Sequence, residues 1–192
     1  MQKLSPIGWA LRPLNNYANF SGRASRAEFW WFFLFMMIVW VVVYVALVGT
    51  LFGAGTTQTG PSEGILGAVG VLGLFLVIFW LAVLIPSIAV QARRLHDTDR
   101  SGWWLGAFYL LYLVYFAMLF LGMGSMMEGV APGTPPDPQK VFGGMFIAIM
   151  ILGTGMFFYM IALIVFYCLP GTQGPNRYGD DPYGANVEEV FA

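Results

Sequence analysis

Charged residues are scarce in this chain of 192 residues, at 10% of the total, whereas hydrophobic residues make up 58%. A soluble globular domain carries roughly a quarter charged residues. In water, a protein this apolar could not cover its surface with polar side chains. Lipid is a solvent that removes this difficulty, so the composition predicts a membrane protein.

Cysteine and histidine are nearly absent, with Cys168 and His96 the single members of their types. One cysteine excludes an intramolecular disulfide and a cysteine metal cluster, and a lone histidine gives no persuasive zinc site. The chain also lacks a nucleophile elbow, a phosphate-binding P-loop and a dinucleotide-binding glycine fingerprint. We therefore expect no metal, no cofactor and no catalytic residue. The formal net charge of −1 gives no basis for a nucleic-acid partner.

Long apolar runs, in contrast, are abundant. A spanning helix needs about 20 mainly apolar residues, and the qualifying runs cover about 29–51, 65–90, 103–123 and 141–169. None of them contains Asp, Glu, Lys, Arg or His. We expect an all-α polytopic fold, a four-transmembrane-helix bundle that forms a single membrane domain over residues 1–192.

The basic residues predict the orientation of these spans. They precede the first span (Lys3, Arg12, Arg23, Arg26), separate the second from the third (Arg93, Arg94, Arg100) or follow the fourth (Arg177). Only Lys140 falls on the other side. Because cytoplasmic loops are enriched in Lys and Arg, we expect segments 1–28, 91–102 and 170–192, and so both termini, in the cytoplasm. The loops of about 52–64 and 124–140 would face the opposite side.

The segment before the first span shows two further signals. It is interrupted by prolines, asparagines and arginines, so it does not read as a signal peptide. Its apolar residues alternate with polar ones, which is typical of a segment lying on the bilayer surface. Ser25 to Glu28 then forms an S-x-x-E capping box, in which the serine hydroxyl caps the helix and the glutamate reaches back.

Glycines recur at short spacings, as in the G-x-x-x-G of Gly49 and Gly53 and in the series from Gly64 to Gly73. Small residues allow helices to approach closely in lipid. Packing within the bundle and a dimer face are both consistent with this pattern, and we favour packing within the bundle.

Polar side chains that could carry function concentrate in segments 20–32, 86–104 and 169–184, which abut helix ends at the same membrane face. We call the candidate binding residues in them the Arg/Asp collar. Its members are Arg23, Arg26, Glu28, Arg93, Arg94, His96, Asp97, Arg100, Asn176, Arg177, Asp180 and Asp181. The collar could be a structural network of ion pairs, or a pocket for an anionic ligand such as a lipid headgroup or phosphate. We favour the structural network.

Asp97 begins the sequence D-T-D-R-S-G, which matches the first six positions of a calcium-binding loop. Such a loop needs a bidentate carboxylate at position twelve, and that position here is Phe108. The preceding arginines would also repel a divalent cation. A turn in which Asp and Ser side chains cap the third span accounts better for the pattern.

The three collar segments carry a resemblance. The motifs F-S-G-R-A-S-R-A-E-F-W-W, R-R-L-H-D-T-D-R-S-G-W-W and P-G-T-Q-G-P-N-R-Y-G-D-D-P occur in this order over about residues 15–183. The chain therefore resembles the YhaH/YhaI-like family of bacterial inner-membrane proteins, which share domain of unknown function 805. The resemblance implies an inner-membrane location and a helical bundle, without an activity, substrate or catalytic residue. In the family pattern the position of Asp99 is often glycine.

Three functions compete. We expect a non-enzymatic membrane module whose collar binds a partner protein or an anionic phospholipid of the surrounding bilayer. A transporter or channel formed by a homo-oligomer is an alternative, although such carriers usually place ionisable residues within the bilayer. An interfacial enzyme acting on a lipid or phosphorylated substrate is a third, with His96 or an aspartate moving a proton.

Overall fold

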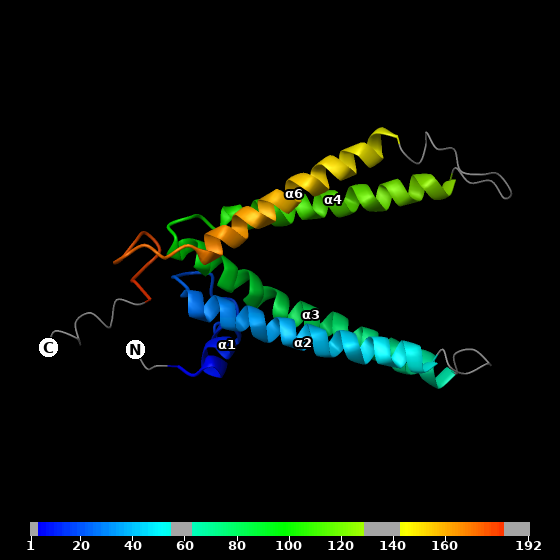
Figure 1. Cartoon of the computed structure of the whole chain (residues 1–192), viewed down its shortest axis with the longest axis horizontal. Coiled ribbons are helices and arrows are strands. Elements are labelled where there is room, and N and C mark those ends of the chain that lie inside the picture. The colour runs from blue at the N-terminus through cyan, green and yellow to red at the C-terminus, as the bar shows by residue number, and fades with distance from the viewer. Residues whose placement is uncertain (1–3, 55–62, 129–142, 183–192) are drawn as a thin grey trace. The chain divides into compact units, whose positions relative to one another are not determined.

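The computed structural model describes residues 4–54, 63–128 and 143–182, which contain five α-helices and no β-strand (Figure 1). The helices are α1 (Pro6–Asn15), α2 (Arg26–Ala54), α3 (Glu63–Asp97), α4 (Trp103–Glu128) and α6 (Gly144–Cys168). The all-α prediction is confirmed. Lys3, Lys140, most of the two loops expected on the far side, and the chain after residue 182 lie outside the described residues.

Four helices are long and apolar enough to cross a membrane, over Arg26–Thr50, Gly70–Asp97, Trp103–Gly122 and Met145–Cys168. Large apolar side chains lie exposed along them, and the exposed fractions of Val42, Tyr44 and Val71 are 62%, 66% and 72%. Apolar surface on this scale is unfavourable in water and marks a face that contacts a membrane or a partner. The prediction of four transmembrane helices is confirmed.

The third helix corrects one predicted boundary. The apolar run predicted a span ending at about residue 90 with a loop from 91, but α3 continues to Asp97. Arginine is a good helix former, and the Arg94–Asp97 pair at spacing i, i+3 supports the last turn. The segment from 91 to 97, which includes four collar residues, is therefore helical, because the helix does not end where its apolar run ends.

The chain divides into two compact units. The first holds α1, α2 and α3 together with the segment that begins at Pro170, and the second holds α4 and α6. The prediction of a single domain with all four spans in one bundle stays a prediction.

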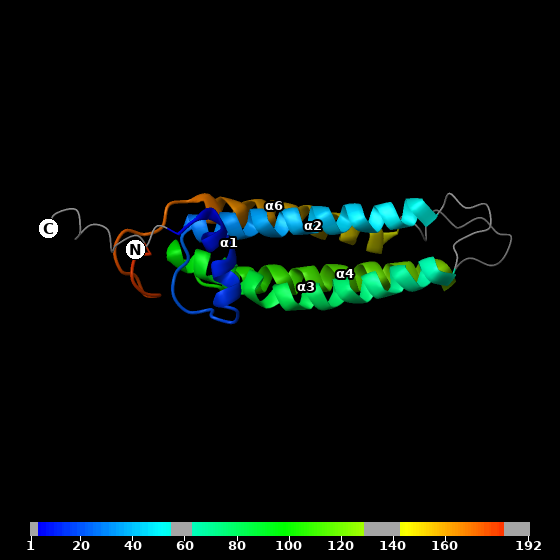
Figure 2. The same cartoon turned by 90° about the horizontal axis from the view of Figure 1, so that it is seen from below.

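In the first unit, α2 and α3 pack side by side as an antiparallel hairpin (Figure 1). The helix α1 packs on both and crosses the start of α2 and the end of α3 (Figure 2). Buried apolar side chains such as Phe29, Phe32 and Leu95 lie near this crossing. The start of α2 and the end of α3, where two of the three collar segments lie, are therefore packed against α1.

In the second unit, α4 and α6 pack against each other. The Tyr159 hydroxyl donates to the Trp104 carbonyl at 2.7 Å, and the rings of Phe108 and Tyr159 stack with centroids 5.8 Å apart. The Ser101 hydroxyl accepts from the Trp103 backbone N–H at 3.3 Å, as expected for a serine at the start of this helix.

The glycine spacings do not mark the helix contacts of the first unit. Among the described residues, a Cβ built at Gly49, Gly67 or Gly70 would meet no atom within 4 Å. The close approach lies in the second unit, where a Cβ at Gly153 would lie 3.2 Å from the Tyr115 ring. A dimer face built on the first set of glycines stays a prediction.

Candidate functional site

Three segments that are distant in sequence meet at the end of α3 in the first unit. The Ala24 N–H, in the loop before α2, donates to the Arg93 carbonyl at 3.0 Å. The Thr172 N–H, in the segment after α6, donates to the Asp97 carbonyl at 2.8 Å. Ala24 and Asp97 are fully buried. The first and last collar segments are therefore both held on α3, and most of the collar is assembled there.

The centre of the collar is a buried group of Arg23, Arg94 and Asp97, which we call the Asp97 clamp. The Arg23 Nε donates to Asp97 Oδ1 at 2.9 Å, and the Arg94 Nη1 donates to Asp97 Oδ2. All three side chains are at most 1% exposed. Hydrogen bonds between charged partners are the stronger kind, so the clamp fixes the loop before α2 onto the end of α3.

The Arg23 guanidinium also holds the C-terminal segment. Its Nη1 donates to the Gly174 carbonyl at 2.6 Å, and its Nη2 donates to the Thr172 carbonyl at 2.5 Å. Every nitrogen of this guanidinium therefore has an acceptor. Both carboxylate oxygens of Asp97 accept from arginines, so the Arg23 donors and the Asp97 acceptors all have hydrogen-bond partners.

A second buried group, which we call the Glu28 triad, consists of Arg12, Glu28 and Arg93. Arg93 Nη1 lies 2.8 Å from Glu28 Oε1, and Arg12 Nε lies 3.6 Å from Glu28 Oε2. The pair with Arg93 is close but not oriented as a hydrogen bond, so Glu28 Oε1 has no hydrogen-bond partner. Arg93 Nε and Nη2 are buried and also lack one. This triad joins α1, α2 and α3, and some of its buried donors and acceptors have no hydrogen-bond partner.

The predicted capping box at Ser25 is confirmed in its first half. The Ser25 hydroxyl accepts from the Glu28 N–H at 3.2 Å and so caps the start of α2. In the described residues the Glu28 carboxylate pairs with arginines of α1 and α3, instead of reaching back to the Ser25 backbone. The glutamate of the box therefore serves the contact between helices.

The C-terminal segment caps α3. The last carbonyls of a helix lack partners within it, and the Asn176 side-chain amide donates to the His96 carbonyl at 2.9 Å. The Asn176 side-chain oxygen accepts from the Tyr178 N–H at 2.9 Å, the local bond that makes asparagine a turn residue. Asp181 accepts from the Gly174 N–H at 3.1 Å and closes the same loop.

His96 has structural partners on both sides. Its Nδ1 lies 3.2 Å from the Gly22 carbonyl, and a carbonyl partner favours the tautomer with a proton on Nδ1. Its ring stacks on Tyr178 with centroids 3.9 Å apart and planes 2° from parallel. The histidine therefore fastens the loop before α2 and the C-terminal segment to α3.

Gly171 explains part of the third motif. A Cβ at this position would overlap the Asp97 carboxyl group, so only glycine lets the backbone pass so close to the clamp. Sequence reasoning missed Gly171, Thr172 and Tyr178 because it selected charged residues, although all three lie within the motif. The basic residue Arg12 entered the sequence analysis only as evidence for the membrane orientation. The one signal for its part in the triad is that basic residues are rare in this chain.

The outer part of the collar is exposed. Arg177 Nε lies 3.0 Å from Asp99 Oδ1, with side chains 60% and 49% exposed. Asp99 has a φ of 55°, a left-handed conformation that glycine adopts without strain and aspartate tolerates. Asp180 is exposed as well.

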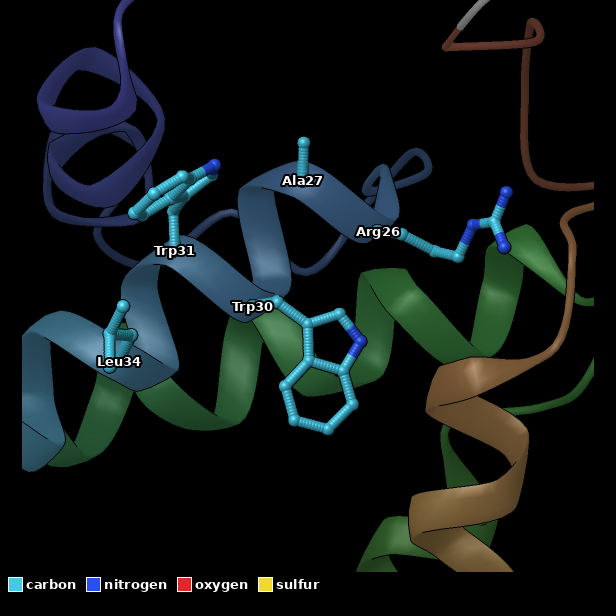
Figure 3. Close-up of a pocket in the computed structure, with 5 residues that line it drawn as sticks. All are labelled: Arg26, Ala27, Trp30, Trp31 and Leu34. Carbon is cyan, nitrogen blue, oxygen red and sulfur yellow. The ribbon is translucent and has the colours of Figure 1, made fainter.

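The two remaining collar residues are Arg26 and Arg100. Arg26, at the start of α2, lines a surface pocket of about 390 Å³ with Ala27, Trp30, Trp31 and Leu34 (Figure 3). Arg100 belongs to the second unit, where its guanidinium lies 4.0 Å from the centre of the Phe166 ring.

The chemistry of the assembled groups favours anions over cations. Asp97, the first residue of the calcium-like pattern, has both oxygens bonded by arginines. Within the described ranges, no three His, Cys, Asp or Glu side chains lie together in a group that could hold a metal ion. Each buried carboxylate faces two arginines, so the clamp and the triad each carry one positive charge in excess.

Comparison with known proteins identifies relatives over most of the chain. A family described as "Protein of unknown function (DUF805)" matches residues 17–180. Inner membrane protein YhaH of Escherichia coli (strain K12) is 33% identical over 176 residues, which cover 92% of this chain and 97% of YhaH. Inner membrane protein YhaI of the same strain is 29% identical over 183 residues, covering 93% and 98% of the two chains. No solved structure matches the chain.

Proposed function

The chain belongs to the DUF805 family, and from that premise we propose that it is a non-enzymatic module of the bacterial inner membrane whose collar binds anionic phospholipid. The observation that carries the proposal is the surplus of arginine around Glu28 and Asp97. An arginine does not lose its proton in a protein, so the excess charge persists where water has little access. A lipid phosphate can supply the missing negative charge.

The position of the collar in the chain supports this ligand. Relatives YhaH and YhaI are named as inner membrane proteins, and the positive-inside rule assigns the basic segments to the cytoplasmic side. Anionic lipids give the cytoplasmic leaflet a negative surface potential. The helix α1 exposes Ile7 and Leu11, as an amphipathic helix does when it lies in the bilayer surface. Arginines near this depth meet lipid headgroups.

The pocket at the start of α2 is consistent with a lipid bound at the depth of the headgroups. Trp30, Trp31 and Leu34, which follow Arg26 along α2, offer apolar surface (Figure 3). Tryptophan is enriched at membrane interfaces, where its ring contacts both headgroups and acyl chains. A largely apolar pocket beside one arginine is consistent with a phospholipid as its ligand.

Two proton-transfer candidates of the enzymatic alternative have structural partners. His96 is stacked on Tyr178 and directed at the Gly22 carbonyl, and Asp97 is bonded to two arginines. Asp97 is fully buried, and both groups are engaged in structural contacts. Their contacts support a non-enzymatic module.

Lipid preference tests the proposal directly. We expect purified protein in nonionic detergent, given equal amounts of phosphatidylglycerol and phosphatidylethanolamine, to retain phosphatidylglycerol severalfold better in native mass spectrometry. The preference should weaken at high salt, because salt screens exposed charges. Equal retention of the two lipids would contradict the proposal. A stoichiometric co-purifying polypeptide together with equal lipid retention would point to a partner protein.

A further inference from the structure

The two arginine groups of the collar differ in how well their donors are satisfied. In the Asp97 clamp, each Arg23 nitrogen has an acceptor in Asp97, Thr172 or Gly174. In the Glu28 triad, Arg93 is 96% buried, and its Nε and Nη2 have no hydrogen-bond partner. Buried polar groups in native proteins are almost always hydrogen-bonded. The missing acceptor is therefore specific to the triad.

The triad also differs from the clamp in how far its arginines are exposed to solvent. Arg12 is 40% exposed, and its Nε lies 3.6 Å from the Glu28 carboxylate, beyond hydrogen-bond length. Its guanidinium is thus held loosely beside the buried Arg93–Glu28 pair and supplies the positive charge that the triad carries in excess. Arg23 and Arg94 of the clamp are at most 1% exposed, so a ligand could reach the triad and not the clamp.

We propose that the Glu28 triad is a binding site for a phosphate oxyanion, held by Arg12 at the surface and by the Nε and Nη2 donors of Arg93 beneath it. Because the two Arg93 donors are buried, binding at this site requires a side-chain movement that exposes them to the ligand. Two adjacent N–H groups of one guanidinium match two phosphate oxygens in a bidentate arrangement. Glu28 keeps Arg93 in place from the opposite side. The inference rests on the proposed function and locates it at one junction of α1, α2 and α3.

The shared chemistry could come from a phospholipid headgroup or from free phosphate. The helix α1 carries Arg12 together with exposed Ile7 and Leu11. These apolar side chains place the site beside acyl chains if α1 lies in the bilayer surface. Separate titrations with phosphatidylglycerol and inorganic phosphate distinguish the two sources.

The decisive experiment compares Arg12→Gln with Arg177→Gln in the full chain. Both arginines are exposed and pair with one carboxylate, so each variant removes the same charge. Native mass spectrometry of protein in nonionic detergent measures phosphatidylglycerol binding. We expect about fivefold weaker binding for Arg12→Gln, the effect of one arginine at a membrane surface, and a smaller loss of at most about twofold for Arg177→Gln, whose exposed charge in the outer collar is screened by salt.

A second variant probes the buried donors. Arg93→Lys keeps the charge but loses the paired N–H groups, and we expect binding to weaken by about tenfold to a hundredfold. If inorganic phosphate binds with the same dependence on Arg12 and phosphatidylglycerol does not, the site takes free phosphate. Phosphatidylglycerol binding that is equal in Arg12→Gln and Arg177→Gln would overturn the inference and leave the proposed function standing. An absence of any preference for anionic lipid in the unsubstituted protein, with no phosphate binding, would overturn both.

Discussion

Replacement of Asp97 by asparagine tests whether the clamp holds the collar together. Asparagine has nearly the same shape, but it carries no charge and presents an N–H₂ group where a carboxylate oxygen was. Arg23 and Arg94, both at most 1% exposed, would then lose the carboxylate with which both pair. Removal of one partner of a buried ion pair costs about 3–5 kcal/mol.

This cost should appear as local opening of the collar. The Thr172 N–H donates to the Asp97 carbonyl, and the Ala24 N–H donates to the Arg93 carbonyl, so these two amides report on the clamp from both sides. Because about 1.4 kcal/mol corresponds to a tenfold change, their hydrogen exchange should accelerate by about two to four powers of ten. The measurement is hydrogen–deuterium exchange by mass spectrometry on protein in detergent micelles.

The matched control is Asp180→Asn, which makes the same chemical change at an exposed position of the C-terminal segment. Its exchange rates should stay within about threefold of the unsubstituted protein, since surface substitutions usually change stability by less than about 0.5 kcal/mol. Circular dichroism should show the same helix content in all three proteins. If Asp97→Asn also left both amides within threefold, the clamp would not hold the segments, and the reasoning from buried charge would be wrong.

Three further predictions follow from particular contacts. Gly171→Ala should loosen the C-terminal segment and destabilise it by about 1–3 kcal/mol, because the new methyl group overlaps the Asp97 carboxyl. Faster hydrogen exchange at Thr172 would show this loosening, and unchanged exchange would contradict it. Tyr178→Ala should speed proteolysis of the segment that follows residue 170 severalfold, whereas Tyr178→Phe should not, since the ring stack on His96 is worth about 0.5–1.5 kcal/mol. Equal cleavage of the two variants would exclude the ring stack as the cause. A green fluorescent protein fused to the C-terminus should fluoresce and an alkaline phosphatase fused there should be inactive, as the positive-inside rule requires; the reverse result would invert the assigned orientation.

The sequence by itself determined the membrane character and the helical architecture. Four apolar runs of sufficient length, none interrupted by a charge, leave helices as the structure that satisfies every backbone group in lipid. Local chemistry also predicted the Ser25 cap of α2, since capping depends on residues three positions apart. Such features are readable because hydrophobicity and local hydrogen bonding depend on near neighbours in the chain.

Only the tertiary structure decided which charges pair. The motifs placed arginines and carboxylates at one face, but several arginines were equivalent candidates for each carboxylate. Asp97 pairs with Arg23, 74 residues away, and Glu28 recruits Arg12 from a helix that carried no binding signal. The end of α3 at Asp97 was missed for the same reason, because partners distant in sequence neutralise the charges of its last turns. Pairing over such separations follows from how helices pack, and packing is a property of the folded chain.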